Sequence, residues 1–131
     1  EFGGLGPPPA AAPGFPADTK LGVPGGAEAG GNTTIGVIAL NAALTPSQAR
    51  RLAVTAHDGF ARALNPVHTP FDGDTIFVLA TGARPLPEPA PLALTVLGSL
   101  ASDCMVRAVA RGIYEAKSEG AARSYRDVFG I

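Results

Sequence analysis

The chain of 131 residues has the length of one domain, and its 46% hydrophobic and 16% charged residues are typical of a globular interior with a modest charged surface. A net charge of −1, without any run of lysine and arginine, excludes a basic surface for a nucleic-acid backbone. The single cysteine, Cys104, excludes an internal disulfide framework and a metal site built from cysteines, so we expect a reducing, cytoplasmic location.

The sequence contains no segment that predicts a membrane partner. Its first residues lack the basic, apolar and cleavage-site regions of a signal peptide, and the apolar run 92–100 is too short to cross a bilayer. Residues 1–31 are dominated by proline, glycine and alanine, a composition that stays extended and buries little surface. We expect a linker or docking tail there, and, because the chain does not begin with methionine, a piece of a longer protein.

Two strand–helix units follow the tail. Residues 34–40 are apolar on both alternating faces and predict a buried strand. A helix should then begin at Pro46, because Thr45 and Gln48 have the spacing of a capping box, and it should end at Asn65-Pro66. The segment 74–81 predicts a second strand that is buried on both faces.

A proline-rich connection leads from the second strand to a long helix predicted over residues 92–117. The spacing predicts an apolar face made of Leu97, Leu100, Ala101, Cys104, Ala108 and Ile113. Cys104 would then be an inert packing residue. The order of elements predicts an α/β fold. Two strands make a small sheet, so we expect an apolar partner segment on the sheet face that the helices leave open.

Thr33 stands at the junction between the tail and the first strand, directly after Asn32 and a run of glycines. If the Asn32–Thr33 bond were cut, Thr33 would hold both a hydroxyl and a free α-amine, the pair that an N-terminal threonine nucleophile requires. The alternative is an ordinary turn into a strand, because Gly-Asn-Thr is common turn chemistry.

Asp72 and Asp74 flank Gly73 at the start of the second strand. Residues two apart in an extended segment project to the same side, so both carboxylates could share a proton or orient an amine and a hydroxyl. The alternative is a solvated Asp-Gly turn. Calcium is a weaker alternative, because the residues after Asp74 are apolar and supply none of the further acidic ligands of a calcium loop.

Each histidine has a functional and a structural interpretation. His57 falls in the predicted helix beside its apolar stripe, which favours a packed, hydrogen-bonded histidine over a catalyst. His68 lies in the loop before Asp72 and could line a site, but no serine motif or metal-spaced histidine accompanies it.

Four motifs occur in order and together carry a family resemblance. They are GGNTTIGVIA at 30–39, LTPSQA at 44–49, AHDG at 56–59 and HTPFDGDT at 68–75. With them the chain resembles the L-aminopeptidase/D-esterase family of self-cleaving N-terminal-nucleophile hydrolases, which includes β-peptidyl aminopeptidases. It is most similar to the nylon-oligomer hydrolase branch, because threonine with two aspartates replaces the serine and glutamate of the peptidase members.

The resemblance implies a precursor that cuts itself between Asn32 and Thr33. Residues 1–32 would then be the tail of an α subunit, and residues 33–131 a β subunit within one αββα domain. Thr33 would be the nucleophile, and the acidic pair that assists it carries over to Asp72 and Asp74. No cofactor or metal is implied. The oxyanion donors of the family, a lysine and an asparagine, come from an upstream α segment that this sequence does not include.

The implied function is an amidohydrolase that cleaves short linear amides or peptides, such as 6-aminohexanoate oligomers or aminopeptidase substrates, through an acyl-enzyme. The implied fold is the C-terminal part of a four-layer αββα sandwich, which requires the upstream α segment as its partner. Units of one α and one β subunit would assemble as a homo-oligomer. The alternative hypothesis is a non-catalytic α/β fragment or structural homologue that keeps the packing and does not cleave itself.

Overall fold

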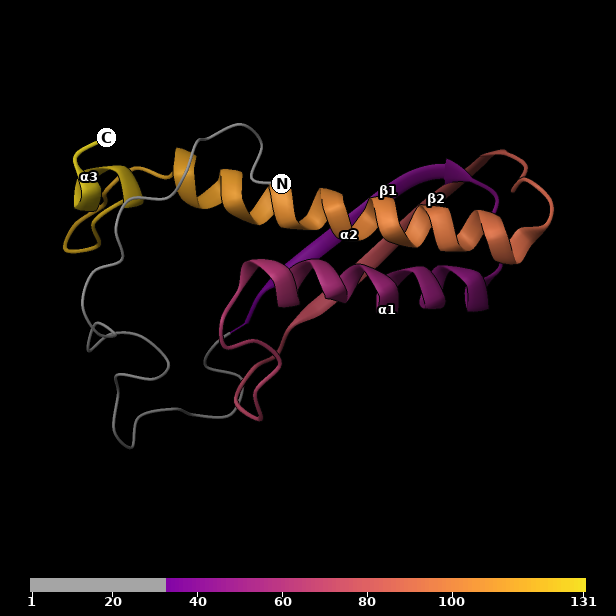
Figure 1. The fold of residues 1–131 in the computed structure, drawn as a ribbon, viewed down its shortest axis with the longest axis horizontal. Helices are drawn as coiled ribbons and strands as arrows, with labels where there is room; N and C mark the ends of the chain where they lie inside the picture. Colours follow the sequence, from indigo (N-terminus) through magenta and orange to yellow (C-terminus); the bar gives the residue numbers. More distant parts are fainter. Residues whose placement is uncertain (1–32) are drawn as a thin grey trace.

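The structure is a computed structural model that describes residues 33–131. The predicted tail, including Asn32, lies outside the described residues. Residues 33–131 form two strands and three helices (Figure 1). The first four elements follow the predicted order and confirm the α/β class, whereas the short last helix was not predicted. Their bounds are β1 Ile35–Ala42, α1 Pro46–Ala63, β2 Thr75–Arg84, α2 Ala90–Glu115 and α3 Tyr125–Phe129.

The strands β1 and β2 lie side by side as a parallel pair, with Ile35 opposite Thr75. Parallel strands need a long crossover, and α1 supplies it (Figure 1). The register shifts after Leu40, where Ala42 pairs with Arg84. The parallel arrangement brings the first residues of both strands to one edge of the sheet.

The start of α1 follows the predicted capping box. The Thr45 side chain accepts a hydrogen bond from the Gln48 backbone N–H, and the Gln48 side chain accepts one from the Thr45 backbone N–H. Pro46 occupies the first turn, where its missing N–H costs no hydrogen bond. The helix ends at Ala63, just before Asn65-Pro66, as predicted.

The buried face of α2 agrees with the prediction only in part. Ala101 is buried and Leu97 packs against the core, as predicted. The other predicted members are exposed, namely Leu100, Cys104, Ala108 and Ile113. The residues that α2 buries are Gly98, Ala101, Ser102, Met105 and Val106. A Cβ atom on Gly59 of α1 would lie only 2.5 Å from the Ser102 carbonyl oxygen, so the two helices approach very closely at this point. At this contact α2 places Ser102 and Met105 against Gly59, whose missing side chain makes the close approach possible.

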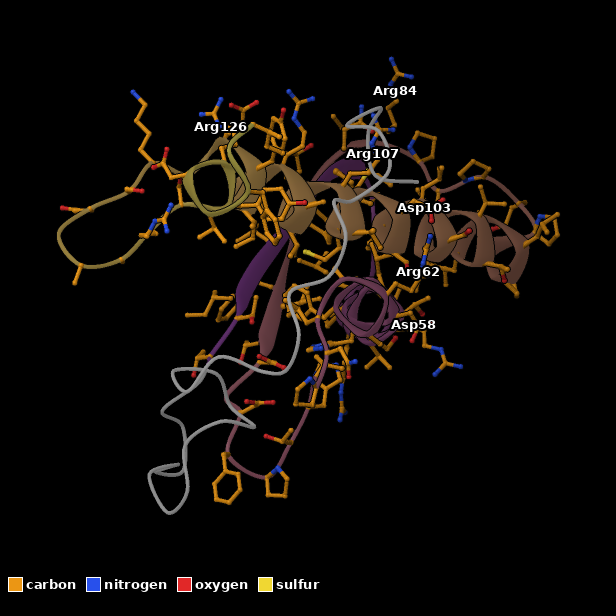
Figure 2. The ribbon with its side chains drawn as sticks, turned by 60° about the vertical axis from the view of Figure 1, so that its left-hand side comes forward. Asp58, Arg62, Arg84, Asp103, Arg107 and Arg126 are labelled. Atoms are coloured by element: carbon orange, nitrogen blue, oxygen red, sulfur yellow. The ribbon has the colours of Figure 1, made fainter. Side chains whose placement is uncertain are left out.

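An ion pair bridges the same two helices at their surface. Arg62 of α1 points toward Asp103 of α2 in Figure 2, with 2.6 Å between Nη1 and Oδ1. Both side chains are partly solvent-exposed, so the pair contributes at most about 1 kcal/mol to stability. The packing of the apolar side chains beneath it is the larger effect.

The core lies between the two helices and one face of the sheet. Its buried members are Leu52, Ala56, Phe60, Ile76, Ala101 and Met105. The opposite face of the sheet carries Ile35, Val37, Phe77 and Leu79, each more than half exposed. The prediction that both strands are buried on two faces is therefore wrong for residues 33–131, because both helices pack on the same face.

The described residues form one helix layer on one sheet layer, and the four-layer sandwich stays a prediction. α2 is a single helix of 26 residues, and by length and composition alone it could cross a membrane. The prediction that no segment reaches this length is thus wrong, since the helix extends well beyond 92–100. The packing of α2 on α1 is equally typical of a core helix of a soluble domain.

Candidate active site

Thr33 lies at the edge of the sheet where both strands begin. The Thr75 backbone N–H donates to the Thr34 carbonyl over 2.9 Å, which extends the strand pairing by one residue toward Thr33. A Cβ atom on Gly73 would lie 2.7 Å from Thr33 Oγ1. The hydroxyl of Thr33 therefore rests against the backbone of Gly73, and only glycine leaves room for it there.

Asp74 ties the second strand to the residue that follows Thr33. Its Oδ1 accepts a hydrogen bond from the Thr34 backbone N–H at 2.9 Å, and its side chain is 2% exposed. Burial by itself raises the pKa of Asp74, but hydrogen bonds from the backbone N–H groups of Thr34 and His68 and from the Thr34 side chain outweigh it. The pKa of Asp74 lies below its ordinary value, and the group is a carboxylate at neutral pH.

Asp72 has different partners, although it stands only two residues away. Its Oδ2 accepts from the Thr69 backbone N–H at 2.8 Å, and its own N–H donates to the Thr69 carbonyl at 2.9 Å. Asp72 thus closes the loop before β2. Its charge also raises the pKa of Asp74, so the two carboxylates interact electrostatically. The structure brings both acids to the edge of the sheet where Thr33 lies, and their catalytic roles stay predictions.

The two histidines meet beside this acidic pair. His68 Nδ1 lies 3.0 Å from Asp74 Oδ2, and the centroids of the His57 and His68 rings are 4.9 Å apart. His57 also packs edge-on against Phe60 at the end of the core, in accord with its structural interpretation. Burial lowers the pKa of His57, the neighbouring His68 lowers it further, and Asp74 and Asp58 oppose the shift.

A groove at the opposite end of the sheet is separate from these residues. Asn41 and Arg84, at the carboxyl ends of the strands, line it together with apolar residues of the connection and of α2, among them Pro87, Leu92 and Val96. Among the described residues its lining is mostly apolar, and its charged members are Arg84 and Glu88. The predicted catalytic residues Thr33, Asp72 and Asp74 lie instead at the amino ends of the strands.

Sequence reasoning named Thr33, Asp72 and Asp74 and missed the contact between His68 and Asp74. The sequence separation of six residues gives no periodic signal, because the contact depends on an irregular loop in which His68 has a φ of 54°. The abundance of turn residues between 65 and 73 indicated a loop but not its shape.

Comparison with known proteins places this site in a family. The sequence profile of peptidase family S58 matches residues 11–125, which is most of the chain. The chain belongs to peptidase family S58. The match includes Thr33 and the segment from His68 to Asp74, and the predicted family membership is confirmed.

Several curated proteins resemble the chain over much of its length. An uncharacterised aminopeptidase of Mycobacterium tuberculosis is 50% identical over 107 residues, which cover 75% of this chain and 31% of that protein. A second uncharacterised aminopeptidase, from Mycobacterium leprae, is 42% identical over 107 residues, covering 75% of this chain and 30% of that protein.

The nylon branch is represented by the 6-aminohexanoate-oligomer endohydrolase of Paenarthrobacter ureafaciens, 36% identical over 86 residues. That match covers 60% of this chain and 24% of the endohydrolase. The chain spans less than a third of the length of these relatives.

Proposed function

We propose that this chain is the nucleophile-bearing part of an autoprocessing amidohydrolase. Thr33 attacks, Asp72 and Asp74 assist, and the substrates are short linear amides or peptides, of the kind that the names of the aminopeptidase and 6-aminohexanoate-oligomer relatives indicate. The observation that carries the proposal is the contact of Thr33 Oγ1 with Gly73, directly between two acidic residues. Family membership supports the same chemistry.

Self-cleavage begins with attack of Thr33 Oγ on the carbonyl carbon of Asn32. The hydroxyl proton passes to the Thr33 nitrogen as the C–N bond breaks, and the acyl group of Asn32 moves from that nitrogen to Oγ as an ester. Water then hydrolyses the ester, which regenerates the hydroxyl and leaves Thr33 with a free α-amine. Asp74 anchors the Thr34 N–H, so it holds the chain on one side of the reacting bond during this step.

Turnover reuses the same atoms. The α-amine of Thr33, with an ordinary pKa near 8, takes the hydroxyl proton while Oγ attacks the substrate amide. The amine product leaves with a proton, and water releases the acyl group from Thr33. The carboxylates of Asp72 and Asp74 offer hydrogen-bond acceptors for the ammonium form of the amine, which would orient it toward Oγ.

The exposed face of the sheet supports an upstream α segment as the partner. Ile35, Val37, Phe77 and Leu79 form a continuous row of apolar side chains across both strands, and a patch of this kind is typical of a surface that another segment covers. Such a segment would complete the sandwich, supply the oxyanion donors and shape the substrate pocket. Assembly of the completed units into a homo-oligomer is part of the same proposal.

Intact mass spectrometry tests the proposal directly. The precursor, this chain with its upstream segment, should yield a fragment that begins at Thr33, and Thr33→Ala should abolish that fragment. Thr95→Ala is the matched control, because it removes the hydroxyl of an exposed threonine of α2 and leaves Thr33 intact. A wild-type precursor that stays uncut under every condition would favour the alternative, a structural homologue without catalysis.

Hydrolysis of a linear amide oligomer provides the second measurement. Asp74→Asn should abolish turnover while leaving the precursor folded, because it removes the charge that faces the ammonium. Unchanged rates in Asp74→Asn would remove Asp74 from the mechanism.

A further inference from the structure

The ring and the backbone of His68 both contact one oxygen of Asp74. Its Nδ1 lies 3.0 Å from Asp74 Oδ2, and its backbone N–H donates to the same oxygen over 3.3 Å. The other oxygen, Oδ1, accepts from the Thr34 N–H. Contacts at both oxygens fix the plane of the carboxylate relative to the backbone that follows Thr33.

The backbone of His68 adopts a conformation that few side chains favour. Its φ is 54°, in the left-handed region, which costs a residue with a Cβ roughly 1–2 kcal/mol. Histidine and asparagine tolerate this region better than most residues. The surrounding contacts hold His68 in this strained conformation, in which its amide and its ring nitrogen reach the same oxygen of Asp74.

His57 supports the His68 ring from the side of α1. The two rings are tilted by 59° with centroids 4.9 Å apart, so His57 occupies part of the space into which the His68 ring would turn. The titratable groups in contact with His68 are Asp74 and His57. Asp58 in turn acts on His57, and Asp72 acts on Asp74. Because burial lowers the pKa of His57, that ring serves as a neutral packing surface near pH 7.

We propose that His68 is a positioning residue, which holds the Asp74 carboxylate in place beside Thr33 through its ring and its backbone amide. The inference rests on the proposed function, because Asp74 is the group through which His68 would act. If the His68 ring were removed, Asp74 Oδ1 would keep its hydrogen bond from Thr34, but Oδ2 would lose its contact with the ring. His68 itself takes no part in bond making.

Two substitutions separate the ring from the backbone. His68→Gly accepts the positive φ and keeps the amide donor, but it removes the ring. His68→Asn also tolerates this φ, and its side-chain amide nitrogen stands close to where Nδ1 stood. Pro70→Ala, an exposed position in the same loop, is the control for general loop perturbation.

Steady-state kinetics of the precursor on a linear amide oligomer gives the first readout. We expect His68→Gly to lower kcat by up to about 100-fold with little change in KM, because a misplaced catalytic group slows the chemical step more than binding. His68→Asn should recover most of the loss, and Pro70→Ala should match the wild type. Equal rates in His68→Gly and wild type, or no recovery in His68→Asn, would overturn the proposal.

The titration of the Asp74 carboxyl, followed by carbon NMR in a Thr33→Ala background, gives a readout that needs no activity. Removing a donor to the carboxylate raises its pKa, so His68→Gly should shift the titration to higher pH and His68→Asn should shift it less. An unchanged titration in His68→Gly would refute the positioning role. An inactive wild type that still shows the shift would refute the proposed function and leave the positioning role supported.

Discussion

The two faces of the β1–β2 sheet differ in what covers them, although both carry apolar side chains. On one face, Ile76 is 7% exposed and packs with Phe60, which is 1% exposed. On the other face, Val37 and Phe77 are 60% and 57% exposed. The comparison teaches that the helices stabilise this chain through one face only, while the other face is apolar surface of the kind that a partner buries.

Thr33 and Asp74 belong to neither face and lie at the amino ends of the two strands. Hydrogen bonds between Asp74, Thr34 and His68 hold this edge, whereas apolar packing holds the covered face. Substitutions on the covered face, at the edge and on the exposed face should therefore affect the chain in decreasing order.

The largest effect is expected from Phe60→Ala on the covered face. The side chain is fully buried in the core, so its removal leaves a cavity and should cost about 3–5 kcal/mol in the free energy of unfolding. Urea denaturation followed by circular dichroism would measure the change. A loss below about 1 kcal/mol would mean that the core is less well packed than the structure indicates.

An intermediate effect is expected from Asp74→Asn at the edge. The pKa of Asp74 is lower in the folded chain than its ordinary value of 3.8, so the carboxylate contributes stability above that pH and loses it as the pH falls through the folded pKa. Weakening its hydrogen bonds should cost roughly 1–3 kcal/mol at pH 7, and the difference from wild type should shrink below pH 4. A difference that is independent of pH would contradict the role of the charge.

The smallest effect is expected from Phe77→Ala on the exposed face of this chain. The ring is already exposed, so the free energy of unfolding should change by no more than about 0.5 kcal/mol. Val54→Ala, at an exposed position of α1, is the matched control. Once the proposed upstream segment is present, Phe77→Ala should become destabilising and Val54→Ala should not. Equal effects of the two substitutions in the longer protein would argue against a partner on this face.

Local sequence determined most of the secondary structure. The capping box of Thr45 and Gln48 sets the start of α1 because both of its hydrogen bonds form within one turn. The runs rich in β-branched residues predicted both strands correctly. Asp72 and Asp74 could be assigned to the residues just before the second strand. Four short motifs predicted the family, and the match to peptidase family S58 confirms it. These motifs lie around Thr33, at the start and in the body of α1, and around Asp74.

Tertiary structure decided what local patterns leave open. The buried face of α2 depends on how closely the helix approaches Gly59. Apolar spacing alone selected Ala101 correctly but missed the buried Met105 and Val106. The alternation of apolar residues in β1 is the same whether its second face is covered or exposed, because a strand pattern records side-chain character and not what packs against it. The pairing of His68 with Asp74 likewise required an irregular loop conformation, with a φ of 54° at His68, that no sequence period encodes.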